Sequence, residues 1–216
     1  MDIFETIKNR HSVRQYENRK IEQEKREVLV EEIRKINEEE NLHIQIFFDE
    51  PKCFNSFMAR MGKFSGVQNY IALVGKNTSD LEEKCGYYGE KLVILAQSLG
   101  LNTCWVAMSH GKSSAKINSG ERQVCIIASG YGKNQGVAHK SKSIEEVTEC
   151  KGTVPEWFEK GMEAVLLAPT AMNQQKFKFT LSDENVSAVS TGGICSGVNL
   201  GIVKYHFEAV TGRKVN

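Results

Sequence analysis

Apolar residues recur at helical spacing in several stretches of this chain. The clearest stretch begins at Ser79, which forms a capping-box pattern with Glu82, and ends at Gly100, which suits the left-handed stop of a helix. Helices are therefore predicted over residues 2–9, 22–40, 79–99, 156–168 and 196–210, with a short helix starting at Ser143. The apolar stripe predicted for the second of these helices consists of Val28, Val30, Ile33 and Ile36.

Other stretches alternate between apolar and polar residues, or form short apolar runs, as strands do. Gly75 is expected to end the second strand, and the residues after 181 are expected to form a polar loop. The segment 51–64 is irregular, and its methionines could cover either a pocket or the core. Helices that interleave with strands indicate an α+β or α/β arrangement of layers. Strands are predicted over residues 43–48, 69–74, 102–108, 123–129 and 176–181.

Size and charge narrow the class of protein. The chain has 216 residues, 40% hydrophobic and 25% charged, which suits one domain or two closely packed halves. A formal net charge of +1 gives no field that would favour nucleic acid or a membrane surface. No apolar run approaches the roughly 18 residues of a membrane span, and the N-terminus shows no export signal. The six cysteines lie far apart, with no CxxC pair and no zinc-finger spacing, so we expect a reduced, cytoplasmic protein.

The chain contains a faint internal echo, in which a helix, a strand, a loop and a second helix occur twice. This echo could mark two similar lobes, residues 1–150 and 151–216, within a single chain. The alternative is that any chain of alternating helices and strands shows such echoes. Both interpretations stay open at this point.

The common catalytic signatures are missing. There is no GxGxxG or GxxxxGK[ST] phosphate loop, no GxSxG elbow and no HExxH zinc motif. The five histidines are scattered, and His206 falls among the apolar positions of its helix. We therefore expect no metal site and no hydrolase chemistry.

The stretch Arg10-His11-Ser12-Val13-Arg14 carries the strongest candidate chemistry. In an extended run, Ser12 and Arg14 point to one side and Val13 to the other, and Arg10 lies at the end of the preceding helix. Two guanidinium groups and a hydroxyl around one point suit a phosphate. The ordinary alternative is a helix end with solvated arginines.

Two further stretches offer polar groups. Lys140 and Lys142 lie two residues apart and would complete a phosphate site if they fold near the two arginines, although such lysines are usually only solvated. Residues 168–175 (APTAMNQQ) end a helix with small residues, which let a flat ligand approach the backbone. Asn173 and Gln175 could bond the edge of such a ligand, or the stretch could be no more than a helix stop.

Together these stretches resemble the FMN-dependent nitroreductase superfamily. RHSVR resembles the family's RxSVRxF start, APTAMNQQ resembles APSxxNxQPW, and residues 89–105 (GEKLVILAQSLGLNTCW) resemble the helix and strand that lead to the flavin N5 region. Residues 126–132 (IIASGYG), followed by the two lysines, resemble its late glycine turn and basic pair. Two features depart from the family pattern: the APSxxN-like stretch comes late, and Lys176 and Phe177 replace the proline and tryptophan.

The resemblance implies an α+β fold with an antiparallel or mixed central sheet flanked by helices. It implies an FMN-dependent oxidoreductase in which NADH or NADPH drives ping-pong reduction of nitro, quinone-like or other small acceptors. Chemistry at flavin N5 would need no catalytic side chain. The alternatives are a reductive dehalogenase, a flavin-fragmenting enzyme, a non-catalytic flavin-binding protein and a plain interaction domain.

The late position of the APSxxN-like stretch suggests that one chain mimics the family's dimer and holds one flavin; an ordinary homodimer is the alternative. The residues implied in FMN binding are Arg10, His11, Ser12, Arg14, Ala107, Met108, Gly130, Lys140, Lys142, Pro169, Thr170, Ala171, Asn173 and Gln175.

Overall fold

The computed structural model describes residues 2–150 and 154–216. Its internal contacts divide the chain into two compact units. The central unit contains Arg10–Leu81 and Leu92–Val137. The C-terminal unit contains the described residues up to Asn9, Glu82–Lys91, and those from Ala138 onward. The units thus interleave along the chain instead of dividing at residue 150, and the internal duplication stays a prediction.

The central unit is built on a four-stranded sheet in the order β1-β2-β4-β3, and each neighbouring pair is antiparallel. The middle strand β2 is buried along almost its whole length, as its run of apolar residues predicts. The strands are β1 (Gln45–Phe47), β2 (Asn69–Lys76), β3 (Asn102–Val106) and β4 (Glu121–Gly130).

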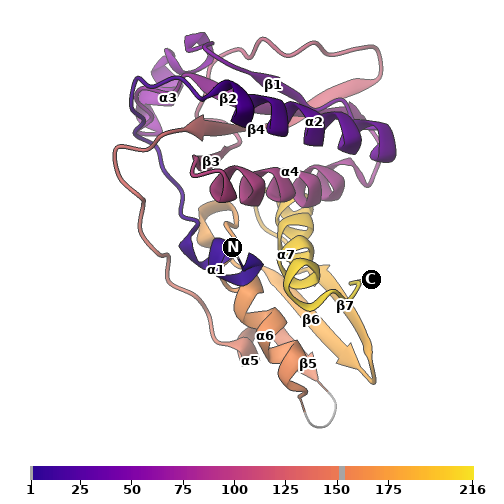
Figure 1. Ribbon diagram of the computed structural model, residues 1–216. Helices are drawn as coiled ribbons and strands as arrows, with labels where there is room; N and C mark the ends of the chain where they lie inside the picture. The colour runs from indigo at the N-terminus through magenta and orange to yellow at the C-terminus, as the bar shows by residue number, and fades with distance from the viewer. Residues whose placement is uncertain (1, 151–153) are drawn as a thin grey trace. The chain divides into compact units, whose positions relative to one another are not determined.

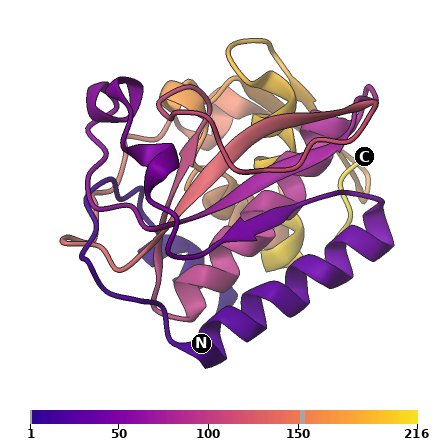
Figure 2. The same ribbon diagram turned by 90° about the horizontal axis from the view of Figure 1, so that it is seen from above.

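Different elements cover the two faces of this sheet (Figures 1 and 2). On one face, Leu29 of α2 (Gln23–Glu40) packs in a cluster with Ala96, with Ile46 of β1 and with Phe48, which follows β1. Ala96 belongs to the second half of α4 (Leu81–Ser98), from Leu92 onward. The other face is covered by η1 (Lys52–Phe54) and α3 (Phe57–Met61). Phe47 points to this second face because neighbouring strand residues alternate in direction.

The C-terminal unit has its own three-stranded mixed sheet, β5-β6-β7. β5 runs parallel to β6, and β6 and β7 form an antiparallel hairpin. Helices α6 and α7 pack on each other, and α7 packs on β7 (Figure 1). Phe158, Phe179 and Phe207 are fully buried and form the aromatic centre of this core. The elements are α1 (Ile3–Asn9), α5 (Ile144–Val147), β5 (Thr148–Cys150), α6 (Glu156–Val165), η2 (Ala171–Asn173), β6 (Phe177–Ser182), β7 (Asn185–Ser190) and α7 (Ser196–Thr211).

The expected α+β fold is confirmed, with antiparallel and mixed sheets flanked by helices. Gly100 adopts the predicted left-handed conformation, with φ of 76°. Among residues 2–150 and 154–216, no helix combines the length and the apolar character that crossing a membrane requires.

Several local predictions were wrong. In α2 the buried residues are Leu29, Ile33 and Ile36, whereas Val28 and Val30 are 43% and 47% exposed. β2 continues through Gly75, because Gly75 pairs with Arg122 of β4; a β-carbon there would press against Leu81 and Leu42, so glycine fits the strand at this position. α4 starts at Leu81 without the side-chain cap expected from Ser79, and the expected polar loop contains β7.

Candidate functional site

The RHSVR stretch begins where α1 ends and continues as an extended segment beside the central sheet. The amide of Val13 donates to the carbonyl of Thr103 in β3 at 3.0 Å, and Tyr16 forms a bridge with Gly132. Val13 and Tyr16 are each 1% exposed, whereas Arg14 is exposed. The predicted extended conformation is therefore confirmed. Val13 and Tyr16 lie three residues apart, so their joint burial does not follow a strict alternation, and the two apolar side chains together hold the segment in place.

Arg10, Ser12 and Arg14 converge on the thiol of Cys104 in β3. Burial raises the pKa of this thiol; the positive charge of Arg14, a hydrogen bond with Ser12 and the positive charge of Arg10 lower it. Two guanidinium groups and a hydroxyl therefore lie close enough to this thiol to act on it. Among the described residues, no carboxylate lies within ion-pair distance of Arg14. We call these three residues the arginine cluster.

A glycine-rich segment covers the backbone of the arginine cluster. A β-carbon at Gly136, whose φ is 71°, would lie 2.7 Å from the Cβ of His11 and 3.0 Å from the Ser12 carbonyl oxygen. Asn102, which is buried, accepts a hydrogen bond from the Gly132 amide at 2.9 Å and donates to Gln135 at 3.0 Å. The sequence analysis did not single out Asn102; a lone amide at the start of an apolar strand is the only sequence signal for it.

The other predicted residues of the central unit occupy the ends of strands. Ala107 and Met108 follow β3 directly, and Met108 is 74% exposed. Gly130 is the last residue of β4, and a β-carbon there would lie 3.2 Å from the Tyr16 ring. Met108 is thus open to a ligand, whereas Gly130 allows the Tyr16 ring to pack closely.

In the C-terminal unit, the two lysines lie beside the APTAMNQQ stretch. The Gln175 amide donates to the Lys140 carbonyl at 2.8 Å and to Asn173 Oδ1 at 2.9 Å, and its oxygen accepts from the Lys142 amide. Lys142 Nζ donates to the Gln175 carbonyl at 3.1 Å, and Asn173 Nδ2 donates to the Lys140 carbonyl at 2.8 Å. We call residues 170–175 with these two lysines the amide loop.

This network divides the residues of the amide loop into two groups. Gln175 is 4% exposed, and its side-chain amide already has partners inside the unit. Asn173 and Lys140 are exposed, and among the described residues no carboxylate lies within ion-pair distance of Lys140. Asn173 and Lys140 are therefore better placed to meet a ligand, whereas Gln175 and Lys142 hold the loop together.

The backbone of the amide loop is strained. Met172, Asn173 and Gln175 have φ values of 53°, 53° and 47°, a region that residues with a β-carbon rarely adopt. Such conformations cost about 1–3 kcal/mol each and occur preferentially at functional sites. The small residues Pro169, Thr170 and Ala171 precede the strained part, and Thr170 Oγ1 accepts a hydrogen bond from the Gln175 amide at 3.1 Å.

Asn199 of α7 supports the amide loop and was not predicted. It is 3% exposed; its Oδ1 accepts from the Ala171 amide, and its Nδ2 donates to the Ile194 carbonyl, both at 2.9 Å. Its position between the apolar residues Val198 and Ile202 of α7 is the sequence signal that could have identified it.

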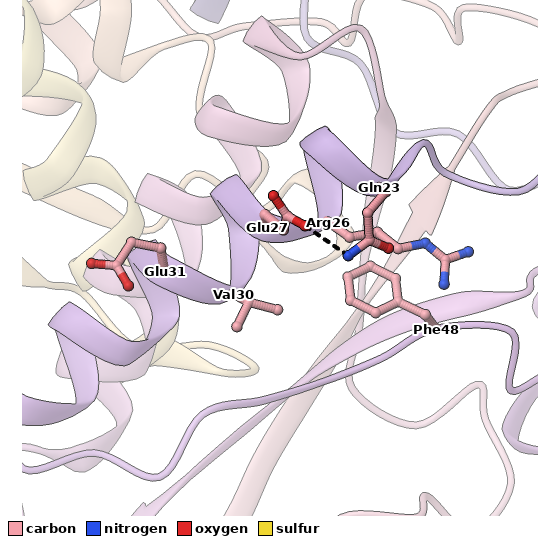
Figure 3. Close-up of a pocket in the computed structure, with 6 residues that line it drawn as sticks. All are labelled: Gln23, Arg26, Glu27, Val30, Glu31 and Phe48. Atoms are coloured by element: carbon pink, nitrogen blue, oxygen red, sulfur yellow. Dashed lines mark hydrogen bonds between the residues drawn. The ribbon is translucent and has the colours of Figure 1, made fainter.

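A pocket of about 540 Å³ on the outer side of α2 contains none of the predicted site residues (Figure 3). Its charged groups are already engaged: Arg26 pairs with Asp49 at 2.9 Å and stacks on the Phe48 ring, and Gln23 donates to Glu27 at 2.9 Å. Among the described residues, no group of three or more histidine, cysteine or acidic side chains is arranged to hold a metal ion.

The comparisons with known proteins identify the family. The family model described as "Putative TM nitroreductase" matches residues 2–211, nearly the whole chain. The chain belongs to this nitroreductase family. The family resemblance inferred from the RHSVR and APTAMNQQ stretches is thereby confirmed, and the family is one of oxidoreductases. None of the curated proteins matches the chain.

Solved structures of nitroreductases share the fold. A structure from Thermotoga maritima described as a "putative nitroreductase" is 25% identical, with a TM-score of 0.69 over 97% of this chain and 83% of that chain. A second, from Desulfovibrio desulfuricans and in complex with FMN, is 13% identical, with a TM-score of 0.57 over 72% of this chain and 99% of that chain. A third, from Bacteroides thetaiotaomicron and described as "Putative NADH dehydrogenase/NAD(P)H nitroreductase", is 17% identical, with a TM-score of 0.52 over 67% and 95%.

The donor set of this nitroreductase is suited to FMN. The arginine cluster gathers two guanidinium groups and a hydroxyl, which match the oxygens of a phosphate monoester. The amide loop presents an exposed amide and an exposed ammonium group beside small residues. Each set lies within its own unit.

Proposed function

We propose that the protein is an FMN-dependent oxidoreductase that takes electrons from NADH or NADPH. It then reduces a nitro compound, a quinone-like compound or another small acceptor in ping-pong turnover. The position of the segment with Arg10, Ser12 and Arg14 along β3, where all three side chains act on the Cys104 thiol, is the observation that best supports this proposal. Membership of the nitroreductase family supports the reaction class.

The arginine cluster is proposed to bind the FMN phosphate. Arg10 is 5% exposed, so its guanidinium charge is little screened by water, and the exposed Arg14 is open to an incoming anion. Ser12 adds a hydroxyl that can donate to a phosphate oxygen. His11 and Gly136 fix the backbone of this segment by their close packing.

The amide loop is proposed to contact the rest of the cofactor. Asn173 would bond the ring edge or the ribityl chain, and Lys140 would add positive charge at the phosphate. Pro169, Thr170 and Ala171 would let the ring approach the backbone, while Gln175 and Lys142 keep the loop in place. In the central unit, the backbone amides of Ala107 and Met108 would face the reactive edge of the ring, next to the Gly130 turn.

Bound FMN supplies the hydride and electron transfer chemistry. The chain itself therefore needs no acid or base. Its arginines and lysine neutralise negative charge, and its amides orient the ring.

A visible spectrum tests the proposal directly. Purified protein titrated with FMN should show saturable binding, with a shifted and structured flavin absorption band. Anaerobic NADH or NADPH should then bleach this band within the time of a catalytic turnover. Protein that remains colourless and leaves the FMN spectrum unchanged would refute the proposal.

The same sample separates the alternatives. Reoxidation by a nitroaromatic compound or a quinone supports the proposed reaction. Reoxidation only by a halogenated phenol, with halide release, would indicate a reductive dehalogenase, and loss of the flavin itself would indicate flavin fragmentation. Bleaching far slower than turnover would indicate a flavin-binding protein without catalysis.

A further inference from the structure

A pocket of about 350 Å³ in the central unit takes no part in the proposed flavin contacts. Its volume lies near the lower end of the roughly 300–1,000 Å³ of small-molecule sites. The pocket is lined by Pro51, Phe54, Asn55, Arg60, Phe64, Ser65, Gly66, Val67 and Gln68.

The pocket has an apolar floor and a polar rim. Phe54, Phe64 and Val67 are 5%, 6% and 3% exposed, and the Phe54 and Phe64 rings are 5.2 Å apart at a tilted angle. Asn55, Ser65 and Gln68 contribute polar groups around this floor. Such a lining suits a ligand that has an apolar ring and one polar end.

Arg60 is the charged residue among those that line the pocket. Among the described residues, no carboxylate lies within ion-pair distance of it. The segment 51–68 also contains Lys52 and Lys63 and no acidic residue. Burial is the main cause of the raised pKa values of Cys53 and Tyr70, and the negative charge of the preceding Glu50 adds to both, so Glu50 lies near these two core residues. The pocket is therefore electrostatically complementary to an anion.

The walls of the pocket are held in place by backbone hydrogen bonds. The Glu50 amide donates to the Gln68 carbonyl at 2.8 Å, and the Phe64 amide donates to the Ala59 carbonyl at 3.0 Å. Gly66, with φ of 71°, packs so closely that a β-carbon would overlap the Tyr16 carbonyl oxygen. The site needs little rearrangement on binding, which lowers the entropic cost of association.

We propose that this pocket binds a small aromatic carboxylate, with the ring on Phe54 and Phe64 and the carboxylate on the Arg60 guanidinium. A guanidinium fork can bind both oxygens of a carboxylate. The proposal does not depend on flavin, and it is tested without flavin or reductant.

The test uses benzoate as the probe and benzamide as its neutral, similarly shaped control. Isothermal titration calorimetry should show that benzoate binds the wild-type chain. Arg60→Gln should weaken it about 10- to 150-fold, the range expected for one charge-assisted hydrogen-bonded contact. Lys52→Gln removes the same charge from the same segment without lining the pocket, and should leave benzoate binding within about twofold, a change far below one charged contact.

Benzamide should bind equally weakly to the wild-type chain and to Arg60→Gln. Amide chemical shifts in ¹⁵N-labelled protein should change on benzoate addition at Ser65, Gly66 and Gln68. Equal benzoate affinity in the wild-type chain and Arg60→Gln would overturn the proposal. So would no detectable binding, or shifts confined to Arg10–Arg14, which would place the anion on the arginine cluster.

Discussion

At the scale of single residues, Arg10, Ser12 and Arg14 act together on the Cys104 thiol of β3. Val13 is buried and its neighbour Arg14 is exposed, as alternation predicts, whereas Tyr16, three residues from Val13, is buried outside that pattern. The supporting roles of Asn102 and Asn199 could not be predicted from a local pattern. Each supports a loop distant in sequence, Asn102 at Gly132 and Asn199 at Ala171, and such contacts depend on the folded chain.

Arg14→Ala tests the phosphate assignment. The variant should bind FMN about 10- to 150-fold more weakly, because one charged hydrogen-bonded contact is worth about 1.5–3 kcal/mol. Fluorescence quenching of FMN measures this affinity. Arg34→Ala is the control, since Arg34 is an exposed arginine of the same unit that pairs with Glu31 and Glu38. Unchanged flavin occupancy in Arg14→Ala would contradict the assignment.

A buried pair in the C-terminal unit is expected to matter for stability. His206 and Glu90 are both fully buried, with Nε2 and Oε1 2.9 Å apart, and His206 Nδ1 lies 2.8 Å from the Ala164 carbonyl. A carbonyl only accepts, so Nδ1 carries a proton, and one further proton must lie between Nε2 and Glu90. Removing one partner leaves the other buried without its main contact.

Glu90→Leu should therefore lower the free energy of unfolding by about 3–5 kcal/mol. Glu90→Gln keeps a hydrogen bond, because its amide can donate to a neutral Nε2, and should cost closer to about 1 kcal/mol. Urea unfolding followed by circular dichroism measures both values. Equal losses in the two variants would show that the proton-sharing contact contributes little.

At the scale of elements, long periodic helices were predicted well, and elements that depend on pairing were not. β5 has three residues and exists through its parallel pairing with β6. β7 alternates, but its small and polar residues Asn185, Ser187 and Ser190 resemble a loop until the hairpin with β6 buries Val186 and Ala188. In α2, the exposure of Val28 and Val30 shows that apolar residues alone do not define the buried face; the neighbouring sheet does.

Within the C-terminal unit, α7 approaches the Glu82–Lys91 part of α4 closely enough to require glycine. A β-carbon at Gly201 would overlap the Glu83 carbonyl oxygen, whereas one at Gly197 would meet the Glu82 side chain at 2.7 Å. Glycine to alanine in a helix normally stabilises by about 1 kcal/mol. Gly201→Ala should instead destabilise, because its β-carbon would lie 2.0 Å from a backbone atom and the two backbones must separate. Gly197→Ala should destabilise less, because its closest contact, with Glu82 Cβ, is longer at 2.7 Å. Thermal unfolding of both variants tests this order, and a more stable Gly201→Ala would contradict it.

The N-terminus of α2 should show a defined dependence on pH. The Tyr131 hydroxyl donates to Glu22, and together with the Glu22 backbone amide and Arg19 it lowers the pKa of that carboxyl to about 2. A lowered pKa means that the contribution to stability is present above the unfolded value of about 4.3 and is lost as the pH falls toward about 2. Glu22→Gln should therefore be less stable than the wild type at pH 6, and the difference should shrink between about pH 4 and pH 2. Urea unfolding midpoints of the wild type and Glu22→Gln at several pH values measure this stability difference. A stability difference that does not change with pH would show that the Glu22 carboxylate makes no such contribution.

At the scale of the whole molecule, the residue sets assigned to flavin belong to two units of one chain. The arginine cluster lies in the central unit, and the amide loop lies in the C-terminal unit. The RHSVR and APTAMNQQ stretches lie about 160 residues apart in the sequence, and each occurs once in the chain. This distribution leads us to propose that one chain supplies both sets to a single flavin.

The stoichiometry of flavin binding tests this idea. If one chain supplies both sets, the loaded protein should sediment as a monomer of 24.2 kDa with one FMN, and the flavin affinity should not change on dilution. If the sets come from different chains, each site is lost when the dimer separates, so flavin release must follow dimer dissociation by mass action. Sedimentation velocity recorded at the flavin absorption band over a wide range of protein concentration separates the two cases. Two FMN per stable dimer, with affinity that falls as the dimer dissociates, would show that this chain uses an ordinary homodimer.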